Sequence, residues 1–528
     1  MSLVSFAFPL LAVYTAVCYF LTPKDYRWSV LLIASWIFYW TNSKKLLLIQ
    51  FGTALFTFII GFLIERLYVV EKEKTERNKE ITKEEKKALR NATKRNARIV
   101  LFFGITVVLG ALILLKYSGF FLKQLSAFSF GEKLKGLNLL VPLGISFYTL
   151  QAISYMIDVY RKKYPADHDP FRFLLFMSFF PQILQGPIAR HNLLAEQLYE
   201  GHDFDYRRAC FGAQRMIWGW MKKMIIADRL AIPVAAIFEN YAQYKGPIIF
   251  FAVALYGLQI YADFSGGMDI AIGFAEVVGV KLEENFRQPY FSTSIEEFWR
   301  RWHMTLGGWM RDYVFYPLSL SKPFAWLSRK SRKVLGAKYG KRLPSFIAMF
   351  IVYILVGIWH GPEWKYLAFG MYNSVIIVCG LIFGETYDRI RNWLHIDKET
   401  VTWKLFQILR TFVIGTFGRY FTRAAGLKDA LKMLKLTFTD WTDPTFLTNG
   451  SLLKLGLDNA NWILLLIAVL VLFYVDHLHE KEVHIRETIA EQNIIFRWLV
   501  YYGAIFAIII FGIYGPAYDA AAFIYGKF

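Results

Sequence analysis

The chain has 528 residues, of which 56% are hydrophobic and 18% aromatic, and its mean hydropathy is +0.34. This composition excludes an ordinary soluble domain and indicates an integral membrane protein. Lys and Arg number 61 against 41 Asp and Glu, a net charge of +20. The basic excess lies in loops between apolar runs, so it indicates cytoplasmic loops of a membrane protein and no nucleic-acid partner.

Long apolar runs recur along the whole chain, and each spans or nearly spans a hydrocarbon layer as a helix. They are continuous rather than alternating, which favours helices over a barrel. We expect an all-α polytopic bundle of about ten to twelve transmembrane helices, with short re-entrant and interfacial helices besides. The first run has no basic segment before it and no cleavage site after it, so we expect a retained helix. The runs include residues 5–22, 31–40, 46–64, 99–115, 346–359 and 462–475.

Two basic segments interrupt the apolar runs. Residues 71–98 hold eleven Lys and Arg against six Glu, and residues 321–342 hold eight basic residues and no acid. Both are expected in the cytoplasm, which places the N-terminus outside if three helices precede the first segment. The first segment predicts a solvated helical hairpin or a disordered loop. No soluble block has its own core, so we expect one membrane domain, 1–528, with C-terminal helices at 405–528.

Three further segments depart from ordinary membrane spans. Residues 173–190 and 255–280 are interrupted by Pro or Gly, which predicts re-entrant or broken helices around a cavity inside the bundle. Residues 426–438 place Leu427, Leu431, Leu434 and Phe438 on one helical face with lysines opposite. That pattern predicts a helix lying in the membrane interface.

Asp263 and Ser265 lie in the second interrupted segment. A carboxylate at membrane depth is a candidate functional group and requires a partner. We expect Arg301 or Arg287 as the partner of Asp263. A purely structural ion pair is the alternative.

Residues 296–317, "EEFWRRWHMTLGGWMRDYVFYP", concentrate Trp, Arg and one His beside apolar helices. If the segment begins as one helix, Trp299, His303 and Gly307 share a face, flanked by Arg300 and Arg301. Such groups usually pair or line a pathway. The alternative is an amphipathic interfacial helix with its arginines on lipid phosphates.

His360 ends the apolar run 346–359 and precedes Gly361 and Pro362. Burial there tunes the pKa of an imidazole. Gly357 and Gly361 predict close approach of another chain or a substrate to the ring. The alternative is an interfacial anchor assisted by Trp359. His477 and His479, beside Asp476 and Glu480, give only a chance resemblance to a metal site, and no metal site is predicted.

These motifs together resemble the membrane-bound O-acyltransferase family. The likeness rests on residues 261–318, "YADFSGGMDIAIGF" through "FWRRWHMTLGGWMRDYVFYPL", on "GIWHG" at 357–361, on "SFFPQILQGPIAR" at 178–190 and on the closing "FIYGKF". It is similar in particular to the bacterial polysaccharide branch, over nearly the whole chain, with a motif core at 139–385. The resemblance implies a helix bundle around a funnel or tunnel where two histidines meet, here His303 and His360.

The chemistry of acyl transfer fits these residues. A hydroxyl needs a positioned base, and we expect His360 to be that base. The oxyanion needs donors, which His303, Trp302 or an arginine supply. The two histidines are able to exchange these roles. We expect the tunnel and the substrate site to be lined by Trp299, Arg300, Arg301, Trp302, Arg311, Asp312, Asp263, Ser265, Asn285, Arg287, Trp359 and Asn373.

The resemblance implies O-acylation of an extracytoplasmic polysaccharide, most simply with acetyl from cytoplasmic acetyl-CoA and no bound cofactor. It also implies the lipid bilayer of a bacterial cell membrane and an extracytoplasmic partner protein. One alternative is D-alanyl transfer to teichoic acids from an acyl carrier protein with a phosphopantetheine thioester. The basic segment 322–342 then docks an acidic carrier, or else it binds anionic lipids. Another alternative function is that of a non-catalytic polysaccharide or lipid transporter.

Overall fold

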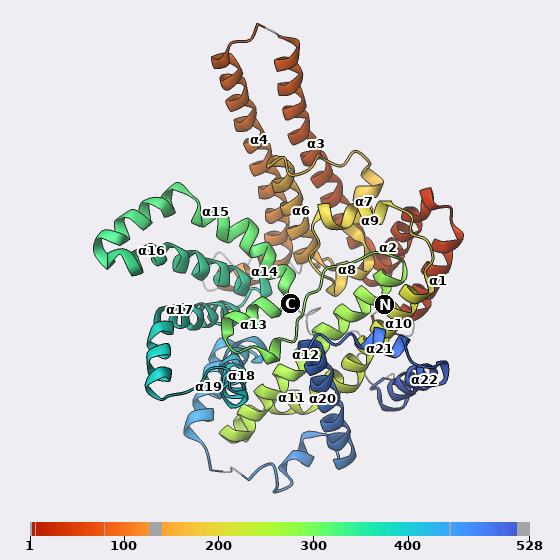
Figure 1. The fold of residues 1–528 in the computed structure, drawn as a ribbon, viewed down its shortest axis with the longest axis vertical. Helices are drawn as coiled ribbons and strands as arrows, with labels where there is room; N and C mark the ends of the chain where they lie inside the picture. The colour runs from red at the N-terminus through yellow and green to blue at the C-terminus, as the bar shows by residue number, and fades with distance from the viewer. Residues whose placement is uncertain (1–2, 6, 79, 126–139, 443–444, 515–528) are drawn as a thin grey trace. The chain divides into compact units, whose positions relative to one another are not determined.

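The apolar runs of the sequence form helices throughout the chain (Figure 1). A computed structural model describes residues 3–5, 7–78, 80–125, 140–442 and 445–514. Within these ranges there is no β-strand, and one isolated antiparallel bridge joins Phe286 to Trp302. The all-α class is therefore confirmed, whereas the motif "FIYGKF" at 523–528 lies outside the described residues.

The chain divides into two compact units. The first comprises residues 1–213 and 271–283. Its helices are α1 (Ala7–Leu21), α2 (Arg27–Ser43), α3 (Leu47–Arg77), α4 (Lys83–Leu112), α5 (Ser118–Leu125), α6 (Ile145–Tyr160), α7 (Pro170–Ser178), α8 (Phe180–Gln185) and α9 (His191–Tyr199). The second unit comprises residues 214–270 and 284–528 and holds both candidate histidines. The single membrane domain expected from the sequence stays a prediction.

Two long helices contribute to both units, α10 (Tyr206–Trp220) and α12 (Gly246–Val277). The remaining helices of the second unit are α11 (Asp228–Glu239), α13 (Ile295–Arg301), α14 (Met304–Met310), α15 (Tyr316–Ser319), α16 (Lys322–His360), α17 (Trp364–Trp393), α18 (Val401–Arg423), α19 (Leu427–Thr439), α20 (Asn459–Glu480), α21 (Ile485–Ala490) and α22 (Ile494–Phe511). In the part of the chain that the structure describes, three π-helical stretches join neighbouring helices: η3 (Ile113–Tyr117), η5 (Met221–Ala227) and η8 (Arg311–Phe315). Short 3-10 turns lie at Lys24–Tyr26, Lys44–Leu46, Tyr241–Gln243, Pro289–Phe291 and Ser451–Leu455.

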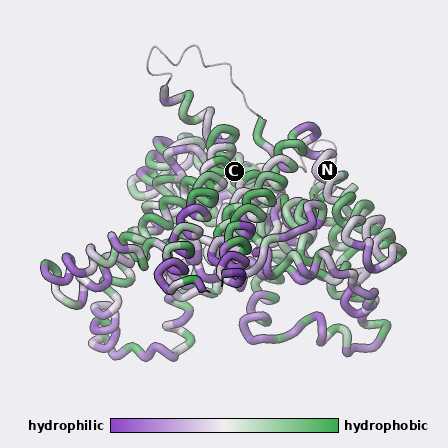
Figure 2. The backbone as a smooth tube through the Cα atoms, turned by 90° about the horizontal axis from the view of Figure 1, so that it is seen from above, coloured by the Kyte–Doolittle hydropathy of each residue, from purple (hydrophilic) through white to green (hydrophobic). Residues whose placement is uncertain are grey.

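Seven helical segments of the described chain are long and apolar enough to cross a membrane. They are Lys24–Arg77, which joins α2 and α3, Lys83–Leu122, Gly246–Val277, Lys322–His360, Trp364–Trp393, Asn459–Glu480 and Ile494–Phe511. The described chain also holds one shorter apolar helix, α1, and the ten to twelve crossings expected from the sequence stay a prediction. Figure 2 shows the same division: hydrophobic residues follow the helices, and hydrophilic residues gather at helix ends and connections.

The charged segment 71–98 forms a helical hairpin, as one of the two sequence predictions proposed. Figure 1 shows α3 and α4 side by side. Helix α4 begins with a capping box, in which Thr82 and Glu85 each accept from the backbone of the other. This arrangement satisfies two N–H groups at the helix start.

The two interrupted segments behave differently. Residues 173–190 break between α7 and α8, where Phe179 leaves helical angles (φ −50°, ψ 110°) and Pro181 fits the first turn of the new helix. The expected break within 255–280 is wrong, because α12 runs through Gly266 without interruption. A Cβ atom on Gly266 would lie 2.8 Å from the Gly219 oxygen, and one on Gly219 would lie 2.5 Å from the Gly266 oxygen. The glycine therefore allows two helices to pack closely rather than ending one.

Helix α19 is amphipathic, as predicted, but it packs through Ala430, Met433 and Thr437. Leu431 and Phe438, from the predicted apolar face, are exposed. An exposed apolar side is what a helix at a membrane interface requires. Its location at the interface stays a prediction.

Candidate active site

The segment that carries His303 is not one helix. Helix α13 begins at Ile295, where the Ser294 side chain accepts from the Glu297 N–H, and it ends at Arg301. Trp302 is extended, His303 has left-handed backbone angles (φ 48°, ψ 52°), and α14 starts at Met304. The predicted shared face of Trp299, His303 and Gly307 is therefore wrong.

A distant segment causes this break. The Arg287 N–H donates to the Arg301 oxygen at 3.0 Å, and the Met304 N–H donates to the Asn285 oxygen at 3.0 Å. These bonds flank the bridge between Phe286 and Trp302. They hold Trp302 extended and compensate for the helical bonds lost there. Left-handed angles at a residue other than glycine are uncommon and are maintained by such surroundings.

The two motif histidines contact the same tryptophan ring. The centroid of Trp359 lies 5.7 Å from that of His303 and 5.1 Å from that of His360. The ring of Phe264 on α12 is perpendicular to that of His303, and their centroids lie 4.9 Å apart. His303 is 3% exposed and His360 is 7% exposed. Two imidazoles are thus brought into one buried aromatic site from two different helix ends.

His303 is uncharged at neutral pH in this site. Burial, and secondly the nearby charge of His360, lower the pKa of His303 well below its usual value. Both effects disfavour the imidazolium form. A neutral imidazole keeps a lone pair that accepts a proton.

His360 is the last residue of α16, as predicted. Gly357 and Gly361, which lie beside it in the sequence, allow α16 and α17 to pack closely. A Cβ atom on Gly357 would collide with the Tyr366 backbone oxygen, and one on Gly361 would lie 2.5 Å from the Tyr366 ring. Helix α17 is thus the chain that approaches most closely, and it brings Phe369 to 5.9 Å from His360.

Trp299 and Asn373 also meet, although 74 residues separate them. The Trp299 indole N–H donates to Asn373 Oδ1 at 3.1 Å. The Asn373 amide in turn donates to the Phe369 oxygen at 2.9 Å. Phe369 packs against both Trp299 and His360. This chain of contacts ties α13 to the end of α16 through α17.

Asp263 is paired with a lysine. Lys223 Nζ lies 2.6 Å from Asp263 and 2.7 Å from Asp228, and all three side chains are at most 3% exposed. Burial opposes the charge of Lys223, but Asp263 and Asp228 raise its pKa above the usual value. The expected partners are wrong: Arg301 pairs instead with Glu297 and Glu480, and the Arg287 side chain is exposed.

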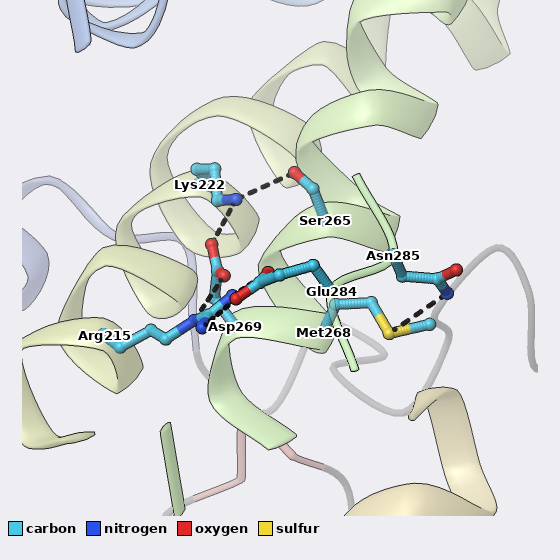
Figure 3. Close-up of polar contacts among 7 residues, drawn as sticks. All are labelled: Arg215, Lys222, Ser265, Met268, Asp269, Glu284 and Asn285. Atoms are coloured by element: carbon cyan, nitrogen blue, oxygen red, sulfur yellow. Dashed lines mark hydrogen bonds and ion pairs between the residues drawn. The ribbon is translucent and has the colours of Figure 1, made fainter. Parts of the chain in front are cut away.

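Ser265 belongs to a second charged cluster on α12 (Figure 3). Lys222 donates to Ser265 at 2.8 Å and to Asp269 Oδ2 at 2.5 Å. Arg215 donates to the other Asp269 oxygen at 2.9 Å and holds both oxygens of Glu284, at 2.7 and 2.5 Å. Bidentate pairing of this kind fixes geometry as well as charge. Glu284 directly precedes Asn285, so this cluster anchors the segment that contacts His303.

The remaining predicted lining residues are distributed between the core and the surface. Trp302 is buried and stacks on Phe298 at 5.4 Å. Arg300 and Arg311 are exposed and pair with Glu296 and Asp312 respectively. Neither arginine is buried with the two histidines.

Comparison with known proteins identifies the family. The family model for MBOAT, the membrane-bound O-acyltransferase family, matches residues 161–398. The probable alginate O-acetylase AlgI of Pseudomonas aeruginosa is 32% identical over 80% of this chain and 71% of its own. The chain belongs to the membrane-bound O-acyltransferase family.

Two relatives with other named acceptors are also similar. The peptidoglycan O-acetyltransferase of Helicobacter pylori is 28% identical over 64% of each chain. The teichoic acid D-alanyltransferase of Bacillus subtilis is 30% identical over 54% of this chain and 69% of its own. The protein is therefore a multi-span membrane acyltransferase.

For this membrane-bound O-acyltransferase, the sequence reasoning missed the basic partners of the α12 carboxylates. The signal was present in "MKKMIIAD" at 221–228, where two lysines interrupt an apolar run. Charges there require partners. The π-helical geometry of η5, which cannot be read from the sequence, carries both lysines to α12. Arg215, Asp269, Glu284 and Thr305 were missed as well.

Proposed function

We propose that this acyltransferase moves an acetyl group from a cytoplasmic thioester donor, acetyl-CoA, to hydroxyls of an exported or cell-wall polysaccharide. The observation that carries the proposal is the pair of buried histidines around Trp359. An acyl transfer to a hydroxyl requires a base of this kind. The O-acetylating relatives support acetyl as the group and a polysaccharide as the acceptor.

The reaction proceeds by exchange of a thioester for an ester. The acceptor hydroxyl gives its proton to an imidazole, its oxygen bonds to the acyl carbon, and the carbon–sulfur bond breaks. The departing thiolate then takes a proton from the imidazolium. Charge that develops on the carbonyl oxygen in a buried site requires donors fixed beforehand.

The proposed setting is a bacterial plasma membrane. The acyl thioester enters a tunnel between the helices from the cytoplasmic side, a hydroxyl of the protein partner or of the polymer takes the acyl group there, and the ester leaves on the other side. An extracytoplasmic protein partner completes transfer to the polymer. The basic charge of segments 71–98 and 321–342 supports their cytoplasmic location.

A second candidate is D-alanyl transfer to teichoic acid from a carrier-bound phosphopantetheine thioester. It is favoured by the D-alanyltransferase relative and by the first half of α16. There Arg329, Lys330 and Lys333 are exposed, and at Gly336 (φ 74°) the backbone departs from helical angles. An exposed basic segment is complementary to an acidic carrier.

The first prediction concerns His360. We expect that deletion of the gene removes acetyl ester from surface polysaccharide, that wild type restores it, and that His360→Ala at equal membrane abundance does not. The reason is loss of an imidazole from the buried pair. The measurement is the acetyl ester content of the purified polymer, with the exposed His484→Ala as the matched control.

The alternatives have distinct outcomes in the same strains. Unchanged acetyl together with lost D-alanyl ester supports the second candidate. Full restoration by His360→Ala refutes the place of His360 in the chemistry.

A further inference from the structure

Helix α16 begins with a basic hairpin. Its first leg comprises residues 322–335 and its second leg residues 337–345, and between them the backbone leaves helical angles at Gly336 (φ 74°, ψ 172°). The Ser331 hydroxyl donates to the Gly340 oxygen at 2.6 Å. In a straight helix these two residues would lie roughly 14 Å apart. The chain therefore doubles back on itself, in the arm beside the α15 and α16 labels (Figure 1).

The two legs touch at their backbones, and their outer faces are exposed. A Cβ atom on Gly340 would lie 2.5 Å from the Cα atom of Arg332. On the first leg, Trp326, Lys330 and Val334 follow at steps of four, and all three are exposed. Residues four apart share a helix face. Lys330 Nζ lies 5.1 Å from the centroid of the Trp326 ring. One outer face thus combines an aromatic ring, a cation and an apolar tip.

The hairpin carries positive charge that the protein itself balances only in small part. Residues 321–342 contain eight basic residues and no acidic one. Among the described residues, Lys338 is the one of these eight that forms an ion pair, with Glu385 on α17. Exposed cations without carboxylate partners create a positive potential that attracts external anions. The hairpin is therefore a surface for an anionic partner.

The position of the hairpin along α16 indicates which anions are close to it. The second leg continues directly into the apolar run 346–359. Gly336 lies ten residues before this run, or roughly 15 Å along a helix. Trp326 lies ten residues before Gly336 on the antiparallel leg, so it returns to the level at which the run begins. Tryptophan is enriched at that level, where lipid headgroups lie.

We propose that the basic hairpin of α16 binds anionic lipid headgroups at the cytoplasmic membrane surface, with Val334 and Leu335 at its tip inserted among them. Val334 is 76% exposed and Leu335 is 48% exposed. Apolar residues flanked by cations are typical of segments that lie in the interface of an anionic membrane. An acidic carrier offers the same charge, but lipid phosphates are present wherever the second leg enters the membrane. The inference concerns the anchoring of α16 and does not depend on the acyl group or its acceptor.

The test measures where the tip lies, in the full-length protein. Val334→Cys, in a background without Cys18, Cys210 and Cys379, carries an NBD label in nanodiscs of phosphatidylcholine alone or mixed with phosphatidylglycerol. A nitroxide on a fixed fraction of the phosphatidylcholine headgroups quenches labels at that depth. We expect quenching to rise about twofold or more with phosphatidylglycerol, because the cations draw the tip into the headgroups. Equal quenching in both lipids overturns the proposal.

Salt and a second position check the origin of the effect. Raising the salt to about 0.5 M screens exposed charges and should remove most of the difference between the lipids. Leu447→Cys is the matched control, since Leu447 is 56% exposed and the stretch 436–453 around it has no basic residue. Quenching there should not depend on lipid charge. A response at Leu447 equal to that at Val334 contradicts a specific role of the hairpin.

Removal of the charge tests the cations directly. Arg329, Lys330 and Lys333 are exposed, so replacing all three by Gln should leave the melting temperature of the protein unchanged. We expect the effect of phosphatidylglycerol on the Val334→Cys label to be lost in this variant. An effect that persists contradicts the role given to these cations.

An acidic carrier as the partner has a different outcome in the same samples. Added acyl carrier protein then shields the label in phosphatidylcholine nanodiscs, and phosphatidylglycerol has no effect. That result overturns the lipid proposal and supports the second candidate function. Failure of the proposed function is separate: a tip in the headgroups together with unchanged acetyl ester in the deletion strain refutes acetyl transfer and leaves this inference intact.

Discussion

Lys223 shows how single residues decide the interior of this protein. It is a lysine at 2% exposure, between Asp228 and Asp263. Removing charges from water costs free energy, and only good geometry offsets that cost. The pairing therefore specifies how η5 lies against α12 rather than adding much net stability.

We expect Lys223→Met to destabilise the protein by about 3–5 kcal/mol, since two buried carboxylates then lose their cation. The measurement is thermal unfolding in detergent at pH 7. The control is Arg300→Met, whose ion pair with Glu296 is exposed and contributes at most about 1 kcal/mol. Equal melting temperatures for wild type and Lys223→Met would contradict the role given to this lysine.

At the scale of elements, the contact between α16 and α17 positions His360. Gly357 on α16 meets the backbone of Tyr366, and Gly370 on α17 meets the backbone of Tyr353. Two glycines on facing helices allow their backbones to approach closely, as is common between membrane helices. Tyr366 and Phe369, from the first turns of α17, then pack on the His360 ring.

Gly357→Ala therefore tests the helix contact without touching a side chain of the site. We expect it to lower stability by about 1–3 kcal/mol and to reduce acetyl transfer, because the new methyl group pushes Tyr366 away and moves His360. Melting temperature and transfer rate are the measurements. Gly380→Ala on α17, where a Cβ atom meets nothing within 4 Å, should leave both unchanged, and a similar effect of the two substitutions would refute the argument.

At the scale of the whole molecule, charge determines orientation in the membrane. Three helices, α1 to α3, precede the basic turn near residue 78. The segment 321–342 has no acidic residue to balance its basic ones. Basic loops stay in the cytoplasm during insertion.

We expect cysteines at Asn78 and Arg329 to face the cytoplasm. In a background without Cys18, Cys210 and Cys379, an impermeant maleimide should label Asn78→Cys and Arg329→Cys in inside-out vesicles but not in intact spheroplasts. Labelling after permeabilisation confirms that each thiol is reactive. Labelling from outside in intact spheroplasts would show that the charge rule fails here.

The sequence by itself determined the helical class, the membrane setting and the acyltransferase family. It also predicted the helix end at His360, and a helical hairpin at 71–98 was one of its two alternatives. These properties depend on composition, on the length of apolar runs and on short motifs, all of which are local. The packing of His303 and His360 on the Trp359 ring is consistent with the pairing that the family motifs implied.

Only the tertiary structure decided how the residues are held. The break at His303 depends on Asn285 and Phe286, and the partner of Asp263 is Lys223, 40 residues earlier. The role of Gly266 within α12 depends on Gly219, which lies in another helix. The physical reason is the same in each case. A backbone group or a buried charge requires a partner, but the local sequence does not specify which distant residue the fold brings to it.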